Sequence, residues 1–362
     1  MTLITIFGPI FFFTHGYSLE FISLLLGLQC IANATSRPLT ARLMHNHSPG
    51  KLLAISIVGL ALTYLLIGNY YQHTLALASL FMLAGALDGA QWSLYQYIFT
   101  KVRIPRHLGS QVGITTNISI TVAALGLVVG GFVAGHYSVA WNYGLAAVAM
   151  GTSAICIIAI KVNNVIERQR YDLSRKDIMA LRKDWLSGVG NLNDWLVVEY
   201  VWPFMLVAVL AKSIELTGYS LALATITMIA VVALVGRFSD KNRAAGKLFN
   251  LGIYVGMVMQ LLRIVGVWAS PIAAAVTLSG SSVRTTYDIP YNVFYYERME
   301  SFGRLRYLTV YETLNNFALA AVWFLLAGLI VLLGTKSAFI FIIIITAVSM
   351  PLMRLIPRKT AI

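Results

Sequence analysis

The chain has 362 residues, of which 58% are hydrophobic and only 11% are charged, with a formal net charge of +13. A soluble globular domain has about 25% charged residues, so this composition excludes that class and indicates an integral membrane protein. The two cysteines, Cys30 and Cys156, lie in separate apolar segments and form no metal-binding or disulfide pattern. We therefore expect no metal site and no cofactor.

Eleven apolar segments are long enough to form membrane-spanning helices, because a hydrocarbon core of about 30 Å needs roughly 20 helical residues. A shorter apolar segment, residues 1–13, precedes them. The sequence therefore predicts an all-α integral membrane protein. The eleven spans are expected near residues 20–42, 52–70, 75–99, 108–135, 139–160, 187–213, 219–238, 248–268, 271–296, 307–334 and 337–356.

Residues 1–13 are too short to span a bilayer alone, and they lack the basic start and the small-residue cleavage site of a signal peptide. They are followed at 16–19 by Gly-Tyr-Ser-Leu, which recurs at 218–221 after a full-length apolar segment. We therefore expect the first helix to be present only in part, with Met1 lying inside it.

The recurring tetrapeptide belongs to a longer internal repeat. The segment from Asp88 to Tyr95 is matched in the second half of the chain by the segment from Asp288 to Tyr295. Matches in one register predict two halves with six helices each in the same orientation, which is a parallel repeat. The predicted domains are an N-terminal six-helix bundle with an incomplete first helix, a linker and a C-terminal six-helix bundle, at residues 1–160, 161–185 and 186–362.

The linker is the most polar part of the chain, since residues 161–184 contain seven Lys or Arg and four Asp or Glu. Most other basic residues, Arg37 among them, fall in loops on the same predicted side, whereas Lys212 and Lys336 fall on the opposite side. Because cytoplasmic loops are enriched in Lys and Arg, the linker and the C-terminus are predicted to be cytoplasmic. The positive net charge thus reflects membrane topology, and nucleic acid is not an expected partner.

The loop between the eighth and ninth predicted helices reads Gly236-Arg-Phe-Ser-Asp240-Lys241-Asn-Arg243. It resembles the loop signature G-x-x-x-D-[RK]-x-[GR] of the major facilitator superfamily, and the two six-helix halves with a basic linker resemble the same family. The resemblance implies a cytoplasmic latch, in which an aspartate near a helix end holds basic residues of a neighbouring helix. The equivalent loop of the first half departs from the signature, with Met44-His45 in place of the Asp-Lys pair.

The predicted latch also includes Glu312, which lies near the cytoplasmic mouth of the eleventh helix. For this residue a latch or capping role and a contact with substrate are both open. The predicted latch residues are Gly236, Asp240, Lys241, Arg243 and Glu312.

Seven ionisable residues fall inside predicted spans, where a charge costs at least about 2.5–3.5 kcal/mol at a helix centre. Arg263 is expected to extend past Trp268 to the membrane surface. The resemblance places the helices of the other six at or beside a central cavity. The seven residues are Asp88, Asp194, Glu199, Arg263, Arg284, Asp288 and Glu312.

Arg284 and Asp288 are four residues apart, so they share a helix face and can pair, either as part of a substrate or proton site or as a structural ion pair. Pro290 follows them and weakens the helix backbone there. Asp88 has no basic neighbour in its own helix, which makes it a candidate proton carrier, or a gate if it pairs with Arg284 across the halves. The predicted substrate and proton pathway comprises Asp88, Gln91, Tyr95, Glu199, Arg284, Asp288 and Tyr291.

These features favour a secondary active transporter that moves a small organic solute across the cytoplasmic (inner) membrane by alternating access. Proton coupling is expected because intramembrane carboxyl groups can titrate and the sequence has no P-loop. The alternative is a non-transporting sensor or assembly factor on the same fold, and the direction of transport is open. An enzyme is not expected, since the nearest approach to a catalytic cluster is His45-Asn46-His47. The expected partners are the solute, protons and membrane lipid, and the chain is expected to be a monomer.

Overall fold

The computed structural model describes residues 2–102, 107–137, 139–159, 174–209, 214–240 and 242–357. Within these ranges the chain folds into helices joined by short loops and contains no β-strand. The prediction of an all-α protein is confirmed for the described residues.

The first half of the chain forms six helices, of which the first is short and contains Pro9. Ser18 and Ser48 begin the second and third helices, since the side-chain oxygen of each accepts a hydrogen bond from a backbone N–H of the first turn. The helices are α1 (Thr2–Thr14), α2 (Leu19–Leu43), α3 (Pro49–Tyr70), α4 (Thr74–Val102), α5 (Leu108–His136) and α6 (Val139–Ala159).

The next described elements are the short helix α7 (Arg175–Ala180), which falls within the predicted linker, and α8 (Arg182–Leu196). The helical path of α8 continues through two π-helical segments on either side of a short α-helix that contains Pro203. These are η2 (Val197–Val201), α9 (Trp202–Phe204) and η3 (Met205–Val209). The remaining elements are α10 (Ile214–Ser239), α11 (Asn242–Gly266), α12 (Ser270–Phe302), α13 (Arg304–Leu333), α14 (Thr335–Ser349) and the 3-10 helix η4 (Met350–Leu355).

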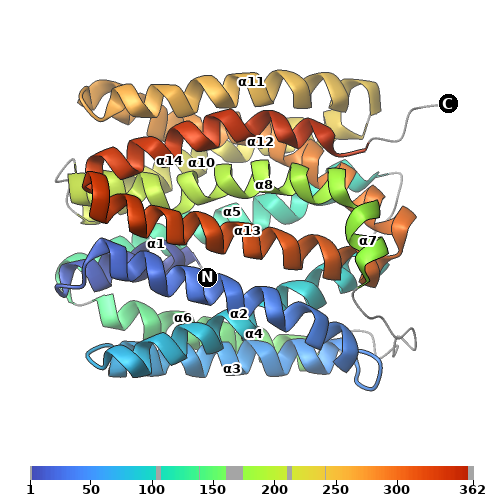
Figure 1. The fold of residues 1–362 in the computed structure, drawn as a ribbon, viewed down its shortest axis with the longest axis horizontal. Coiled ribbons are helices and arrows are strands. Elements are labelled where there is room, and N and C mark those ends of the chain that lie inside the picture. Colours follow the sequence, from blue (N-terminus) through green and yellow to red (C-terminus); the bar gives the residue numbers. More distant parts are fainter. Residues whose placement is uncertain are drawn as a thin grey trace.

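Nine helices in the described part of the chain are long and apolar enough to cross a membrane, namely α2 to α6, α10, α11, α13 and α14. Figure 1 shows α8 and α12 running alongside them, with their axes in roughly the same direction. The chain is therefore an integral membrane protein, as its composition predicts.

Helices at matching positions of the two halves make matching contacts. α2 packs against α4 and α13, while α10 packs against α12 and α5. α3 packs on α4 as α11 packs on α12. In Figure 1, α2, α3, α4 and α6 lie in the lower part of the molecule and α8, α11, α12 and α14 in the upper part.

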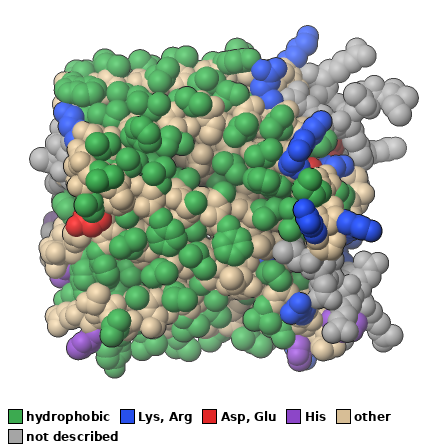
Figure 2. All heavy atoms as spheres, viewed as in Figure 1, with side chains coloured by type: hydrophobic (Ala, Val, Ile, Leu, Met, Phe, Trp, Pro, Cys, Tyr) green, Lys and Arg blue, Asp and Glu red, His purple; other side chains and the backbone are tan. Residues whose placement is uncertain are grey.

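Basic side chains gather at one end of the molecule. In Figure 2 most of them lie at the right-hand end, where Figure 1 places α7, and hydrophobic side chains cover most of the body between the two ends. This distribution suits a protein whose body lies in lipid and whose basic end lies in water.

The contact between α4 and α2 depends on small residues. A Cβ atom at Gly85 of α4 would overlap the carbonyl oxygen of Gln29 on α2, and one at Gly89 would lie 2.7 Å from the carbonyl oxygen of Asn33. Helices in membranes rely on such close packing because there is no hydrophobic driving force between them.

We predict that Gly85→Ala lowers the apparent unfolding temperature in detergent, because the added methyl group has to push the two helices apart. The expected cost is about 1–3 kcal/mol. Gly144→Ala in α6 is the matched control, since a Cβ at Gly144 meets open space. Equal unfolding temperatures for the two variants would show that the α4–α2 contact is not close-packed.

Candidate functional site

Two adjoining cavities lie between helices of the first and second halves. The first has a volume of about 410 Å³ and is lined by α4, α5, α10, α12 and, from η2, Val198 and Glu199. The second has a volume of about 310 Å³ and is lined by α2, α4, α8, η2, α12 and α13. The cavities share a wall, because both are lined by Trp92, Gln96, Arg284 and Asn292.

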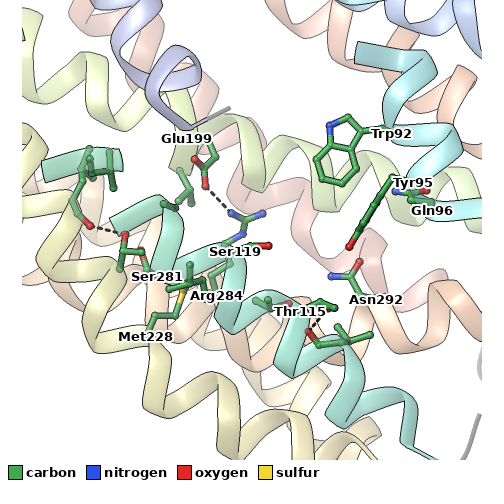
Figure 3. Close-up of a pocket in the computed structure, with 18 of the residues that line it drawn as sticks. Trp92, Tyr95, Gln96, Thr115, Ser119, Glu199, Met228, Ser281, Arg284 and Asn292 are labelled. Atoms are coloured by element: carbon green, nitrogen blue, oxygen red, sulfur yellow. Dashed lines mark hydrogen bonds and ion pairs between the residues drawn. The ribbon is translucent and has the colours of Figure 1, made fainter. Parts of the chain in front are cut away.

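Arg284 of α12 is bound by two carboxylates. Its Nε lies 3.2 Å from Oδ2 of Asp194, which is fully buried. Its Nη1 lies 3.4 Å from Oε1 of Glu199, whose side chain is 29% exposed. Figure 3 shows Glu199 and Arg284 pointing toward each other on one side of the first cavity, across from Trp92 and Tyr95. The inner carboxylate is therefore sealed in protein, whereas the outer one is open to the cavity.

Asp194 is fixed by further hydrogen bonds. It accepts one from Gln260 Nε2 at 2.7 Å and one from the Tyr287 hydroxyl at 2.9 Å. Gln260 Oε1 in turn accepts a hydrogen bond from Arg263 Nη1 at 2.7 Å. The network joins α8, α11 and α12. Buried ions need such bonds, because hydrogen bonds and opposite charges must offset the loss of hydration.

The expectation that Arg263 extends to the membrane surface is wrong. Arg263 is only 3% exposed, and its guanidinium carbon lies 5.8 Å from the centre of the Trp202 ring. Gly280 leaves space for it, since a Cβ there would lie 2.8 Å from Arg263 Nη2. The residue points inward because Gln260 and the Asp194 network give its charge partners there.

A second network joins α2, α4 and α13. Asn33 Nδ2 donates to Asp88 Oδ2 at 2.9 Å, and Asn33 Oδ1 accepts from Arg37 Nε at 2.9 Å. Arg37 also donates to Ser93 Oγ at 3.0 Å, and its Nη2 lies 3.6 Å from Glu312 Oε2. The prediction that Arg37 lies in a loop is wrong: it lies inside α2 and is 4% exposed, because these partners satisfy it within the protein.

Tyrosines continue this network along α12 and α13. The Tyr295 hydroxyl lies 2.6 Å from Gln96 Oε1 and 2.9 Å from Glu312 Oε1. The hydroxyls of Tyr291 and Tyr311 are 2.6 Å apart. All three tyrosines are buried and line the second cavity, so they form a hydrogen-bonding wall rather than a membrane-surface belt.

Six of the seven residues predicted for the substrate and proton pathway line the two cavities: Asp88, Tyr95, Glu199, Arg284, Asp288 and Tyr291. Gln91 is not among the lining residues, and its Oε1 is buried without a hydrogen-bond partner among the described residues. The structure thus brings most of the predicted residues together, and their roles remain predictions.

Arg284 and Asp288 attract each other, as their spacing predicts, but they do not form a direct ion pair within 4.0 Å. The guanidinium group contacts Asp194 and Glu199 instead, and Asp288 Oδ2 accepts a hydrogen bond from Asn292 Nδ2 at 3.2 Å. A spacing of four residues permits a direct pair, but Asp194 of α8 and Glu199 of η2 lie closer to the guanidinium group. Asp88 likewise binds Asn33, and its predicted alternative of pairing with Arg284 is not seen.

Several functional candidates were missed by the sequence reasoning. Arg37 could have been found, because it falls inside the predicted span at 20–42 and lies four residues after Asn33. The aromatic residues give no comparable signal, since a tryptophan in an apolar span faces lipid as readily as a cavity. Those that line the second cavity are Trp92, Trp195, Tyr200 and Trp323.

The latch motif joins α10 to α5. Asp240 Oδ1 accepts a hydrogen bond from the backbone N–H of Ser110 at 3.2 Å, and Oδ2 accepts one from the Ser110 hydroxyl. Ser110 lies in the first turn of α5, where unpaired amides carry partial positive charge. Gly109 and Gly236 permit the approach, since a Cβ at Gly109 would lie 2.7 Å from the Gly236 carbonyl oxygen and one at Gly236 would lie 3.1 Å from the Gly109 carbonyl oxygen. Among the described residues, the partner of Asp240 is therefore the N-terminus of a helix, and the basic residues expected as partners include some that lie outside the described residues.

Of the other predicted latch residues, Glu312 is described and is not part of this contact. Lys241 and the side chain of Arg243 lie outside the described residues. Glu312 lies in the second cavity beside Arg37. A latch role and a contact with substrate were both left open for Glu312. Its position in the second cavity makes a contact with substrate possible.

A family model for the Major Facilitator Superfamily matches residues 1–304 of the chain. The chain belongs to the major facilitator superfamily. The resemblance drawn from the loop signature is thereby confirmed, and the family identifies the chain as a membrane transport protein rather than an enzyme. A search of curated proteins found no match.

Solved structures of superfamily transporters share the fold. The human organic anion transporter MFSD10 (TETRAN) has a TM-score of 0.68 at 13% identity, over 96% of this chain and 89% of that one. The nucleoside transporter NupG has a TM-score of 0.64 at 11% identity, over 99% of this chain and 95% of that one. At such identities the likeness concerns the fold alone.

We predict that Arg284→Gln strongly lowers the apparent unfolding temperature, because it leaves Asp194 buried without its guanidinium partner. Breaking a buried pair in this way costs about 3–5 kcal/mol. Arg304→Gln is the matched control: Arg304 pairs with Glu300 at 3.5 Å on the surface, where a pair contributes about 1 kcal/mol or less. Adding Asp194→Asn to Arg284→Gln should restore part of the lost stability. Equal losses of stability in Arg284→Gln and Arg304→Gln would contradict the role of the buried pair.

Proposed function

We propose that this superfamily member is a secondary active transporter that carries a small organic solute through the two cavities by alternating access. The observation that carries the proposal is the position of these cavities. They lie between helices of the two halves, and their walls hold ionisable side chains from both, including Asp88 and Arg284. A carrier needs a site of this kind, because rocking two repeats about it exposes it to either side.

The architecture that we propose is two six-helix bundles, with eleven full membrane helices and a partial first one. The first bundle comprises α1 to α6 within residues 1–160, and the second comprises the α8–η3 path and α10 to α14 within residues 186–362, joined by the linker at 161–185. The matching contacts of α2 with α4 and of α10 with α12 support this division. The contacts of α2 with α13 and of α5 with α10 then form the interface between the bundles.

We propose that the end of the molecule that holds the basic residues is cytoplasmic and that the contacts across it keep it closed. Asp240 binds Ser110 there, and the rings of Phe99 and Tyr296 are 5.0 Å apart between α4 and α12. Opening this end requires these contacts to break, so they act as the latch of the carrier. We propose that the chain lies in the cytoplasmic (inner) membrane with its linker and C-terminus on the cytoplasmic side. We also propose that it acts as a monomer.

We propose protons as the coupling ion. Glu199 is the partner of Arg284 that faces the cavity, and its protonation would release the guanidinium group from it. Glu199 lies in the π-helical segment η2, and such segments occur often at functional sites because they widen the helical turn. A carboxyl group that gains or loses a proton can thus change the contacts of α12 with the α8–η3 path.

The superfamily transporters of similar fold are named for organic anions and for nucleosides. A thermal-shift screen of the purified protein with solutes of all charge classes identifies the solute, because a ligand that binds the folded state raises its stability. Hits are then tested for counterflow in proteoliposomes. Binding of a partner protein without any solute flux would favour a sensor or assembly factor.

We predict that a disulfide between Ser110→Cys and Asp240→Cys, in a background with Cys30→Ala and Cys156→Ala, stops transport. The cross-link would keep the α5–α10 contact closed, so counterflow should fall to the background level and return on reduction. The two single cysteine variants, treated with the same oxidant, are the controls. Undiminished counterflow in the cross-linked protein would show that this contact does not need to open.

We predict that Asp288→Asn abolishes uptake driven by a pH gradient while membrane insertion stays intact, because the side chain can no longer take up a proton. Glu20→Gln, at the start of α2 outside both cavities, is the matched control. Measurement of gradient-driven uptake and of protein yield in the membrane checks both parts. Unchanged uptake would remove Asp288 from the coupling mechanism.

A further inference from the structure

Carboxyl groups outnumber guanidinium groups in the cavities. Among the described lining residues there are four carboxyl groups and two guanidinium groups: Asp88, Glu199, Asp288, Glu312, Arg37 and Arg284. Behind the wall, Asp194 and Arg263 add one group of each sign, so the excess of two carboxyl groups remains. The second cavity taken alone is lined by three carboxyl groups and two guanidinium groups. A cavity with an excess of carboxyl groups attracts positive charge rather than negative charge.

The guanidinium groups that line the cavities are already bound by the protein. Arg37 contacts Asn33, Ser93 and Glu312 through its three nitrogens. Arg284 contacts Asp194 and Glu199. An anionic ligand that binds either guanidinium group would have to displace the protein groups that contact it. Displacing Asp194 would leave a buried carboxylate unpaired, which is costly.

Asp88 and Asp288 are the two carboxyl groups left over. Among the described residues neither has a basic partner within 4.0 Å, and each accepts a side-chain hydrogen bond only from an amide, Asn33 and Asn292 respectively. Asp88 Oδ1 has no hydrogen-bond partner at all among those residues. The two aspartates come from α4 and α12, at matching positions of the repeat, and both line the second cavity. Arg37 and Arg284 attract these two carboxylates from beyond 4.0 Å, so a ligand cation between the aspartates would be their direct ion-pair partner.

Aromatic rings form another part of the same wall. Tyr200 lies between Trp195 and Trp323, with ring centres 5.2 Å and 5.3 Å apart, and Trp92 lines the cavity as well. The faces of such rings attract organic cations. The described residues contain no group of three His, Cys, Asp or Glu that could hold a metal ion, so the donor set suits an organic cation better than a metal.

We propose that the second cavity binds an organic cation that carries an aromatic or apolar group, with its charge between Asp88 and Asp288 and its apolar part against the rings of Trp195, Tyr200 and Trp323. Its volume of about 310 Å³ is at the lower end of ligand pockets, which are about 300–1,000 Å³. This inference rests on the proposed transport function and names the class of its substrate.

The test compares cations with anions of the same size and shape. Binding to the purified protein in lipid nanodiscs is measured by equilibrium dialysis, with empty nanodiscs to correct for partition into lipid. The cations are benzyltrimethylammonium, 1-methyl-4-phenylpyridinium and tetraphenylphosphonium. Their anionic counterparts are benzylsulfonate, 4-phenylbenzoate and tetraphenylborate.

At least one cation of the series is expected to bind saturably, and its counterpart is expected to bind at least tenfold more weakly. Asp88→Asn and Asp288→Asn should each raise the Kd of that cation tenfold or more. Asp288→Glu should keep most of the affinity, and Glu20→Gln, which removes a carboxyl group outside the cavities, should leave the Kd unchanged. The unfolding temperature of each variant is measured to show that it is folded.

The proposal is overturned if the anions bind as well as the cations, if no cation binds to the folded protein, or if both Asn variants keep the wild-type Kd. Transport itself is tested separately by counterflow of hits from the full solute screen. Counterflow of an anion or a neutral solute would overturn the cation proposal and leave the transporter proposal standing. Absence of counterflow for every hit, with cation binding retained, would overturn the transporter proposal instead.

Discussion

The ion pair between Arg284 and Asp194 is the interaction on which the site depends. Asp194 is fully buried, so the low polarity around it makes an unpaired charge there very unfavourable. Gln260, Tyr287 and, one step further, Arg263 complete its hydrogen bonding. The pair fixes α12 against α8 and α11, and it thereby fixes the wall that carries Arg284 and Asp288. Gly280 supports the same arrangement, because the absence of a side chain there leaves room for Arg263.

The two partners of Arg284 differ in a way that suits a carrier. Asp194 is enclosed, and removing it would unpair a buried charge, whereas Glu199 faces the first cavity on a π-helical turn. The inner partner keeps the guanidinium group in place, and the outer one can change its state. Glu199 of η2, Asp88 of α4, Asp288 of α12 and Glu312 of α13 all line the cavities. In our proposal, protons and a cationic solute would compete for these carboxyl groups.

The sequence was sufficient for the fold class, the family and most of the charged residues that line the cavities. The internal repeat and the cost of charge in lipid carry that information, so Asp88 and Asp288 could be found without a structure. Pairing was harder to predict, because the partners of Arg284, Arg263 and Arg37 include residues on other helices. The i, i+4 spacing predicts that Arg284 pairs with Asp288, whereas in the folded chain its direct partners are Asp194 and Glu199. The partner of Asp240 was also missed, since a helix N-terminus leaves no residue-specific signal.

Alternating access is tested most directly by pulsed electron paramagnetic resonance with spin labels in two separate double variants. One pair is placed at exposed positions of the basic end, at Asn46 after α2 and Ser301 in the last turn of α12. The other pair is placed at exposed positions of the opposite end, at Gln72 after α3 and Lys336 in the first turn of α14. A carrier is expected to show two distances in each pair, with opposite shifts when a transported solute or a lower pH is applied: one end opens as the other closes. A single distance at both ends, unchanged by solute and by pH, would contradict alternating access between the two halves.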